Sequence, residues 1–138
     1  MDRAQFSAGA EAVLGRFYDT SQIPRGSGNN AQISAYLQNF ATSLGLESAV
    51  DSAGNVIVRK PAAAGCEAGV PVILEAHYDM VCERTPESRH DFSGPLELCR
   101  AGDKIFADGT TLGADNGLGV AAIMAVLVMF IGDPQLSF

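Results

Sequence analysis

An uninterrupted apolar run, Val120–Ile131, lies near the C-terminal end of the 138-residue chain. It is shorter than the roughly 18 apolar residues that a membrane span requires, so it predicts a buried core helix, with a membrane segment as the alternative. We expect this helix to begin near Asp115 or Gly117 and to end at about Phe130. The chain has the length of one domain, and its hydrophobic content of 47% is sufficient for a single core.

Two amphipathic helices are predicted near the start of the chain. The first covers about Phe6–Tyr18, and the second stops at Gly45, a favourable residue just after a helix end. Between them, Arg25–Asn30 is rich in turn formers and is expected to cap the second helix. The apolar faces comprise Phe6, Ala10, Val13, Leu14 and Phe17 in the first helix and Ile33, Leu37, Phe40, Ala41 and Leu44 in the second.

Two β-hairpins are predicted further along the chain. Leu46–Val50 and Asn55–Arg59 flank an Asp-Ser-Ala-Gly turn, and the second of these segments is rich in β-branched residues. Leu96–Cys99 and Lys104–Ala107 flank an Arg-Ala-Gly-Asp turn in the same way. The chain therefore changes from helices to strands after its first third.

A further strand is predicted between the hairpins. Pro61–Gly69 has the composition of a flexible connector, and Val70–Leu74 is an apolar run of the length of a buried strand. Helices, strands and a last apolar helix in this order predict an α/β fold in which a mixed sheet lies between helices.

The charge of the chain argues against nucleic acid as a partner. The formal net charge is −7, with 16 acidic and 9 basic side chains, and no run of Lys or Arg could follow a phosphate backbone.

Cysteine usage and the first residues predict a cytoplasmic protein. Cys66, Cys82 and Cys99 are too widely spaced for a zinc knuckle and too few for a disulfide framework, so we expect reduced thiols. The segment Met1–Phe6 lacks the basic start and the apolar core of a secretory signal.

His77 and Asp79 follow the predicted strand Val70–Leu74 at its carboxyl end. Two residues apart on extended backbone, their side chains point the same way. An imidazole binds a metal ion well when a carboxylate fixes the proton on its other nitrogen, and Asp79 is placed to do this for His77. For this pair alone, a surface histidine and aspartate without a metal is the alternative.

Asp115 lies between Gly113 and Gly117 at the predicted start of the last helix. The glycines allow close backbone packing and unusual dihedral angles around this carboxylate. An N-cap aspartate is the alternative. A carboxylate can also bridge two divalent ions about 3.5–4 Å apart, as in two-metal aminopeptidases. Together with His77, Asp115 therefore indicates metal-assisted hydrolysis.

These residues belong to a set of motifs formed by His77–Glu83, His90–Phe92 and Gly109–Gly119. The set resembles the aminoacyl-histidine dipeptidases, also called β-alanyl-histidine dipeptidases or peptidase D, a branch of the M20 zinc metallopeptidases. Ile23–Asn29 and Asn55–Pro61 match the same branch. The resemblance extends from about residue 12 to residue 127.

The resemblance implies roles for individual residues. His77 falls on the metal-ligand histidine, Asp115 on the metal-bridging aspartate, and Asp79 on the catalytic acid that orients the histidine. Family members often hold the peptide bond after the bridging aspartate in cis, which here is Asp115-Asn116. No metal-ligand role is implied for His90, for which we expect a structural or surface role, or for Cys82, for which we expect burial.

The resemblance also implies a reaction and a cofactor. A metal-activated water would hydrolyse dipeptides of the Xaa-His or β-alanyl-His type at a site with two zinc ions, for which Co²⁺ or Mn²⁺ could substitute. The predicted partner is a small peptide, with no nucleic acid and no membrane, and the full-length protein could be a homodimer.

Residues 1–138 would form the N-terminal portion of the metallopeptidase catalytic domain. The general base, the remaining ligands and the lid or dimerisation domain would lie outside this chain, so the chain alone is expected to be weakly active or inactive. One alternative is a truncated, non-catalytic remnant that binds a metal or a partner. Another is a purely architectural resemblance in which the acids cap helices.

Overall fold

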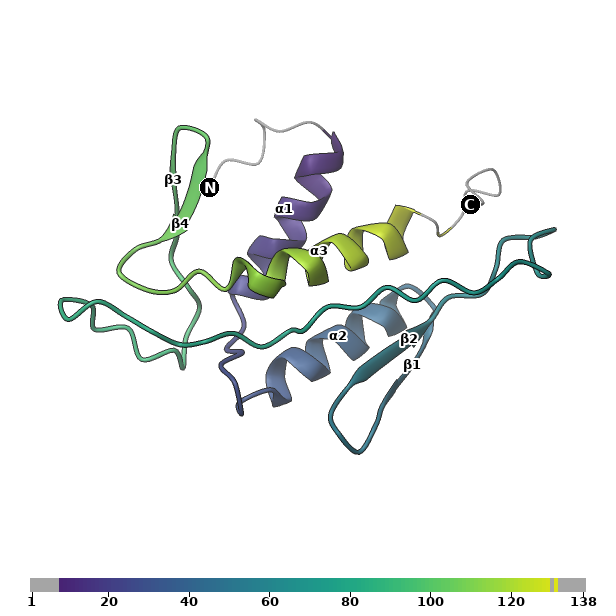
Figure 1. Cartoon of the computed structure of the whole chain (residues 1–138), viewed down its shortest axis with the longest axis horizontal. Helices are drawn as coiled ribbons and strands as arrows, with labels where there is room; N and C mark the ends of the chain where they lie inside the picture. The colour runs from purple at the N-terminus through teal and green to yellow at the C-terminus, as the bar shows by residue number, and fades with distance from the viewer. Residues whose placement is uncertain (1–7, 130, 132–138) are drawn as a thin grey trace.

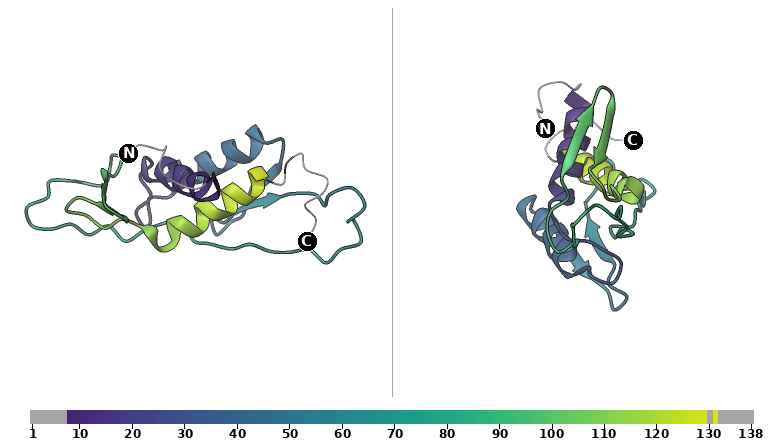
Figure 2. Two further views of the ribbon diagram at one scale, coloured as in Figure 1. Left: turned by 90° about the horizontal axis from the view of Figure 1, so that it is seen from above. Right: turned by 90° about the vertical axis from the view of Figure 1, so that its left-hand side faces the viewer.

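The computed structural model describes residues 8–129 and 131, which form three helices and two small antiparallel sheets (Figure 1). The elements are α1 (Ala8–Ser21), α2 (Ala31–Ser43), β1 (Glu47–Val50), β2 (Val56–Arg59), β3 (Leu98–Ala101), β4 (Lys104–Ala107) and α3 (Ala114–Met129). The molecule is elongated, with α1 crossing α3 and with α2 and the β1–β2 hairpin on the other side of α3 (Figures 1 and 2). The predicted α/β class is confirmed, and the strands form two separate hairpins.

The core lies where α3 packs on α1. Phe17 of α1 is buried, as are Val120, Ala121 and Met124 of α3. The predicted core helix is therefore confirmed, and its first residue lies within one position of Asp115. None of the helices within residues 8–129 and 131 has both the length and the apolar character needed to cross a membrane. Phe6 and Phe130, the predicted ends of the first and last helices, lie outside the described residues.

Helix α2 is confirmed, with one correction at its start. Gly45 follows it with a φ of +70°, a conformation that glycine adopts at little cost. The expected side-chain cap at the other end is wrong, because Asn30 occupies the N-cap position without a capping hydrogen bond. Its φ of −101° and ψ of −3° differ from the extended backbone that aims a capping side chain at the first helical amides.

Both predicted hairpins are confirmed. In β1–β2, Glu47 lies opposite Arg59, and the Asp51 carboxylate accepts hydrogen bonds from the backbone N–H groups of Ala53 and Asn55 across the turn. In β3–β4, the first strand begins at Leu98, two residues later than expected, and the turn shortens to two residues.

The predicted buried strand Val70–Leu74 is wrong. Its residues are extended but form no ladder with another described segment, and Val70 and Ile73 are 90% and 87% exposed. The segment is part of a longer extended stretch of chain that crosses most of the length of the molecule (Figures 1 and 2). Apolar composition indicated a strand, but burial requires a neighbouring strand or helix on each face, and the described part of the chain provides none there.

Candidate functional site

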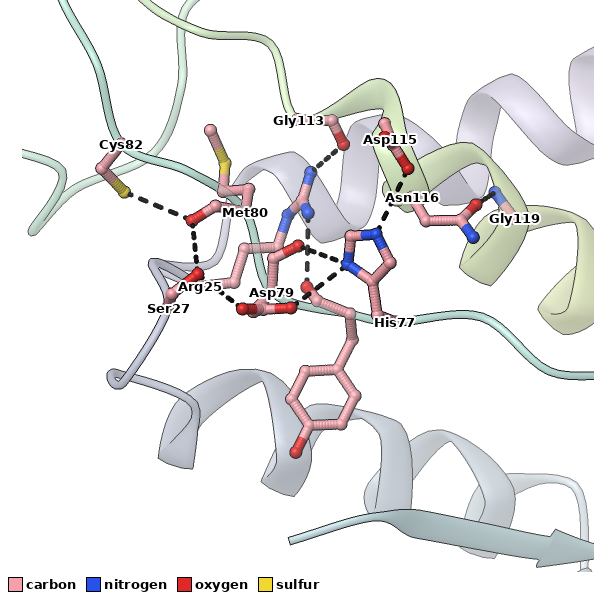
Figure 3. Close-up of polar contacts among 11 residues, drawn as sticks. Arg25, Ser27, His77, Asp79, Met80, Cys82, Gly113, Asp115, Asn116 and Gly119 are labelled. Carbon is pink, nitrogen blue, oxygen red and sulfur yellow. Dashed lines mark hydrogen bonds and ion pairs between the residues drawn. The ribbon is translucent and has the colours of Figure 1, made fainter.

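The extended segment after Leu74 leads to His77 and Asp79, which lie beside the start of α3 (Figure 3). His77 Nδ1 is 3.2 Å from Asp79 Oδ1, and His77 Nε2 is 3.2 Å from Asp115 Oδ1. The structure therefore brings together all three residues that the sequence singles out, including two that are 38 positions apart.

Asp115 and Asn116 interrupt the start of α3. Both residues have non-helical φ and ψ, and the peptide bond between them is cis, as the resemblance implies. Asn116 Oδ1 accepts a hydrogen bond from the backbone N–H of Gly119, whereas the Asp115 carboxylate is 97% exposed and contacts His77. Asn116 therefore has the capping role that the alternative interpretation gives to Asp115.

Backbone pairing holds the His77 and Asp115 segments together. Arg84 and Thr110 form an antiparallel bridge. The Thr111 backbone N–H donates to Glu83 O at 2.9 Å, and its hydroxyl donates to Val81 O at 2.7 Å. The site thus lies next to two chain segments that are connected by several hydrogen bonds.

Two further residues contact the site, although no functional role was predicted for them from the sequence. Arg25 is 2% exposed and donates to Tyr78 O and Gly113 O, and Ser27 Oγ donates to Asp79 Oδ2 at 2.5 Å (Figure 3). The match of Ile23–Asn29 to the dipeptidases was the sequence feature that could have indicated a role for these two residues.

Hydrogen bonding shifts the pKa values of the site residues. The bond from Ser27, together with the contact with His77, holds the pKa of Asp79 below its ordinary value despite some desolvation. Desolvation lowers the pKa of His77, but the hydrogen bonds with Asp115 and Asp79 outweigh it and raise that pKa above its ordinary value. Burial lowers the pKa of the Arg25 guanidinium, against the attraction of Asp79.

These contacts indicate which nitrogen of a neutral His77 carries the proton. An ionised Asp79 only accepts hydrogen bonds, so Nδ1 is the donor to it and Nε2 of a neutral imidazole carries a lone pair. That lone pair and the Asp115 oxygen are both acceptors, so they can lie 3.2 Å apart favourably only with a proton or a cation between them.

His77 Nε2 and Asp115 Oδ1 are spaced to occupy two of the four coordination positions of a zinc ion. Ligand atoms about 2.0–2.1 Å from a tetrahedral zinc ion lie about 3.3 Å apart, close to the separation of His77 Nε2 and Asp115 Oδ1. Within the described residues, no three His, Cys, Asp or Glu side chains gather into a potential metal site. The chain therefore presents two potential ligands with one orienting carboxylate.

Cys82 and His90 lie apart from this pair. Cys82 Sγ is 3.8 Å from Met80 O, and partial burial raises the pKa of the thiol. The His90 ring packs edge-on against Phe92, with ring centres 4.8 Å apart. The three cysteines are free thiols, as expected.

A search of known proteins finds similarity to a dipeptidase. The chain is 41% identical to the cytosol non-specific dipeptidase of Escherichia coli K12 over 112 residues, which are 80% of this chain and 23% of that protein. No protein-family model matches the chain.

Two solved structures share the fold. The aminoacylhistidine dipeptidase of Vibrio alginolyticus has a TM-score of 0.85 and 33% identity, over 98% of this chain and 26% of that one. A tripeptidase of Staphylococcus aureus has a TM-score of 0.67 and 27% identity, over 86% of this chain and 31% of that one.

Sequence and fold therefore relate this chain to a class of enzymes, the peptidases of small peptides. Within this class, the resemblance to the aminoacyl-histidine dipeptidases is confirmed. The chain spans about a quarter of the length of the dipeptidases that it matches.

Proposed function

We propose that this chain contributes part of the metal site of a dipeptidase, with His77 and Asp115 as ligands and Asp79 as the residue that orients His77. One observation carries the proposal: His77 Nε2 and Asp115 Oδ1 converge to 3.2 Å while Nδ1 contacts Asp79. Two acceptors that approach in this way provide a place for a cation.

The proposed reaction is hydrolysis of dipeptides of the Xaa-His or β-alanyl-His type. The name of the Vibrio relative supports histidine-containing substrates, and that of the E. coli relative supports broader specificity. A bound divalent ion, zinc in our proposal, would polarise the peptide carbonyl and lower the pKa of a water molecule. The complete site would hold two such ions, with Asp115 between them.

In this proposal, residues of the chain bind the cation and orient its histidine ligand. Asp79 accepts the Nδ1 proton of His77 and so keeps the Nε2 lone pair directed at the cation. Asp115 supplies negative charge from a largely exposed position, where a substrate can approach. Residues 1–138 would form the N-terminal portion of the catalytic domain, and the cytosolic E. coli relative supports a cytoplasmic location.

Zinc retained after dialysis tests the proposal. His77→Ala and Asp115→Asn should each lose the zinc that the parent chain retains, because each removes a proposed ligand. His90→Ala and Asp91→Asn are matched controls, since they remove the same groups near Phe92, and they should retain zinc. An absence of zinc in the parent, or equal loss in the controls, would refute the metal site.

Hydrolysis is assayed separately with β-alanyl-His and with a dipeptide that lacks histidine. Zinc-dependent release of free histidine that disappears in His77→Ala supports the dipeptidase. Zinc retention without hydrolysis would support the alternative, a metal-binding module that does not catalyse the reaction by itself.

A further inference from the structure

Residues Arg25–Ser27, here called the bracing loop, contact both segments that carry the proposed ligands. The Arg25 guanidinium donates from Nη1 to Tyr78 O at 3.3 Å and from Nη2 to Gly113 O at 2.8 Å. Tyr78 follows His77 directly, and Gly113 lies two residues before Asp115. One buried side chain thus connects the backbone on either side of the site (Figure 3).

The backbone of the bracing loop is paired with the same region. Met80 N donates to Arg25 O at 2.9 Å, and Ser27 N donates to Met80 O at 3.0 Å, which makes Gly26 and Met80 a parallel bridge. This pairing fixes the position of the loop along the His77 segment. It places the Ser27 hydroxyl opposite Asp79, the residue before Met80.

A chain of polar contacts leads from the bracing loop to the proposed metal ligands. Ser27 Oγ donates to Asp79 Oδ2 at 2.5 Å, the other oxygen of Asp79 is 3.2 Å from His77 Nδ1, and His77 Nε2 is 3.2 Å from Asp115. Because Ser27 occupies one carboxylate oxygen, Asp79 is held with its second oxygen toward the imidazole (Figure 3).

We propose that the bracing loop is a positioning element: Ser27 fixes the Asp79 carboxylate so that His77 keeps its proton on Nδ1, and Arg25 sets the spacing between His77 and Asp115. The consequence for metal binding rests on the proposed function. The consequence for His77 does not, because orientation and tautomer are properties of the metal-free chain. Neither Arg25 nor Ser27 contacts the position between the ligands, so both act through other residues.

Nitrogen NMR of the imidazole rings in the metal-free chain tests the inference. At a pH at which both imidazoles are neutral, long-range ¹H–¹⁵N spectra distinguish the Nδ1–H tautomer from the Nε2–H tautomer. His77 of the parent should be the Nδ1–H tautomer. Ser27→Ala should reduce that population, although the Asp79 backbone carbonyl, also 3.2 Å from Nδ1, remains as an acceptor. The His90 signals should stay in place as an internal reference. Ser43→Ala removes a hydroxyl with a similar 2.7 Å contact in α2 and is the matched control.

Zinc titration provides a second measurement. Loss of an outer hydrogen-bond partner typically weakens metal binding about 10-fold or more, so Ser27→Ala should raise the zinc dissociation constant by about that factor. Arg25→Lys keeps the charge but loses the two-pronged contact, and it should also weaken binding, whereas Arg16→Lys in α1 should not. If Arg25→Lys fails to fold, Ser27→Ala still provides the test, because Ser27 is exposed and its hydroxyl is not part of the core.

The two measurements separate the two proposals. An unchanged His77 tautomer in Ser27→Ala overturns the inference, whatever the zinc result. A parent chain without zinc affinity refutes the proposed function, and the tautomer comparison still decides the inference. A tautomer shift that the Ser43→Ala control reproduces would also overturn the inference.

Discussion

Gly113→Ala should destabilise the chain strongly, because Gly113 lies where the bracing loop meets the start of α3. A Cβ atom built there would lie 2.6 Å from Arg25 Nη2 and 2.7 Å from Met80 Sδ, both closer than real contacts allow. The φ of Gly113 is +64°, a left-handed conformation that side chains other than glycine rarely adopt.

Two costs contribute to the expected effect. The left-handed backbone costs an alanine about 1–2 kcal/mol. Displacing the buried guanidinium removes its hydrogen bond to Gly113 O, and bonds to charged groups contribute about 1.5–3 kcal/mol. Gly113→Ala should therefore lower the free energy of unfolding by about 2.5–5 kcal/mol, the sum of these ranges.

Gly28→Ala is the matched control, since Gly28 has a φ of +85° but no atom within 4 Å of the added Cβ. It should show only the backbone cost of about 1–2 kcal/mol. Urea unfolding followed by far-ultraviolet circular dichroism gives both values by linear extrapolation. Equal destabilisation of the two variants would refute the claim that Arg25 and Met80 are packed tightly against Gly113.

Three further predictions concern the rest of the fold. Met124→Ala should cost about 2–5 kcal/mol in urea unfolding because Met124 is buried in the α1–α3 core, and a cost no larger than that of the half-exposed Val128→Ala would contradict this. Gly15→Ala should raise stability by about 0.5–1 kcal/mol, since its Cβ meets nothing within 4 Å on α1, and a lower unfolding midpoint would exclude it. Hydrogen bonds from Asn55 and Ala53 lower the pKa of Asp51 in the folded chain. The contribution of the Asp51 carboxylate to folding stability is therefore present above the unfolded pKa of about 3.9 and is lost as the pH falls through the folded pKa. The difference in melting temperature between the parent and Asp51→Ala should therefore be larger at pH 6 than at a pH below the folded pKa of Asp51, and a constant difference would contradict this assignment.

Local sequence signals were sufficient for the elements that are stabilised locally. The Asp51 turn is held by hydrogen bonds within four residues, and Gly45 ends α2 through its own backbone conformation. Such contacts depend on neighbours in the sequence, so composition and spacing predict them. The cap of α2 is the exception: turn formers in Arg25–Asn30 indicated a cap, but the backbone conformation of Asn30 was not predictable from composition.

Long-range pairing was not predictable from these signals. Val70–Leu74 has the composition of a buried strand, but a strand exists only where a partner pairs with it, and composition does not reveal the partner. The contacts of Arg25 in the site were unpredictable for the same reason. Its two carbonyl partners are 53 and 88 residues away, and no local pattern around an arginine in a turn-rich loop indicates them.

The contacts of the two acids support the different roles proposed for them. Both oxygens of Asp79 have partners, Ser27 on one side and His77 on the other, so this carboxylate is held in place and is poorly available to a cation. The Asp115 side chain is 97% exposed, and among the described residues its carboxylate has a polar contact with His77 through Oδ1. A bridging ligand has to offer both oxygens, and an orienting residue has to keep a fixed direction. These contacts therefore support our proposal that Asp115 is the ligand and that Asp79 orients His77.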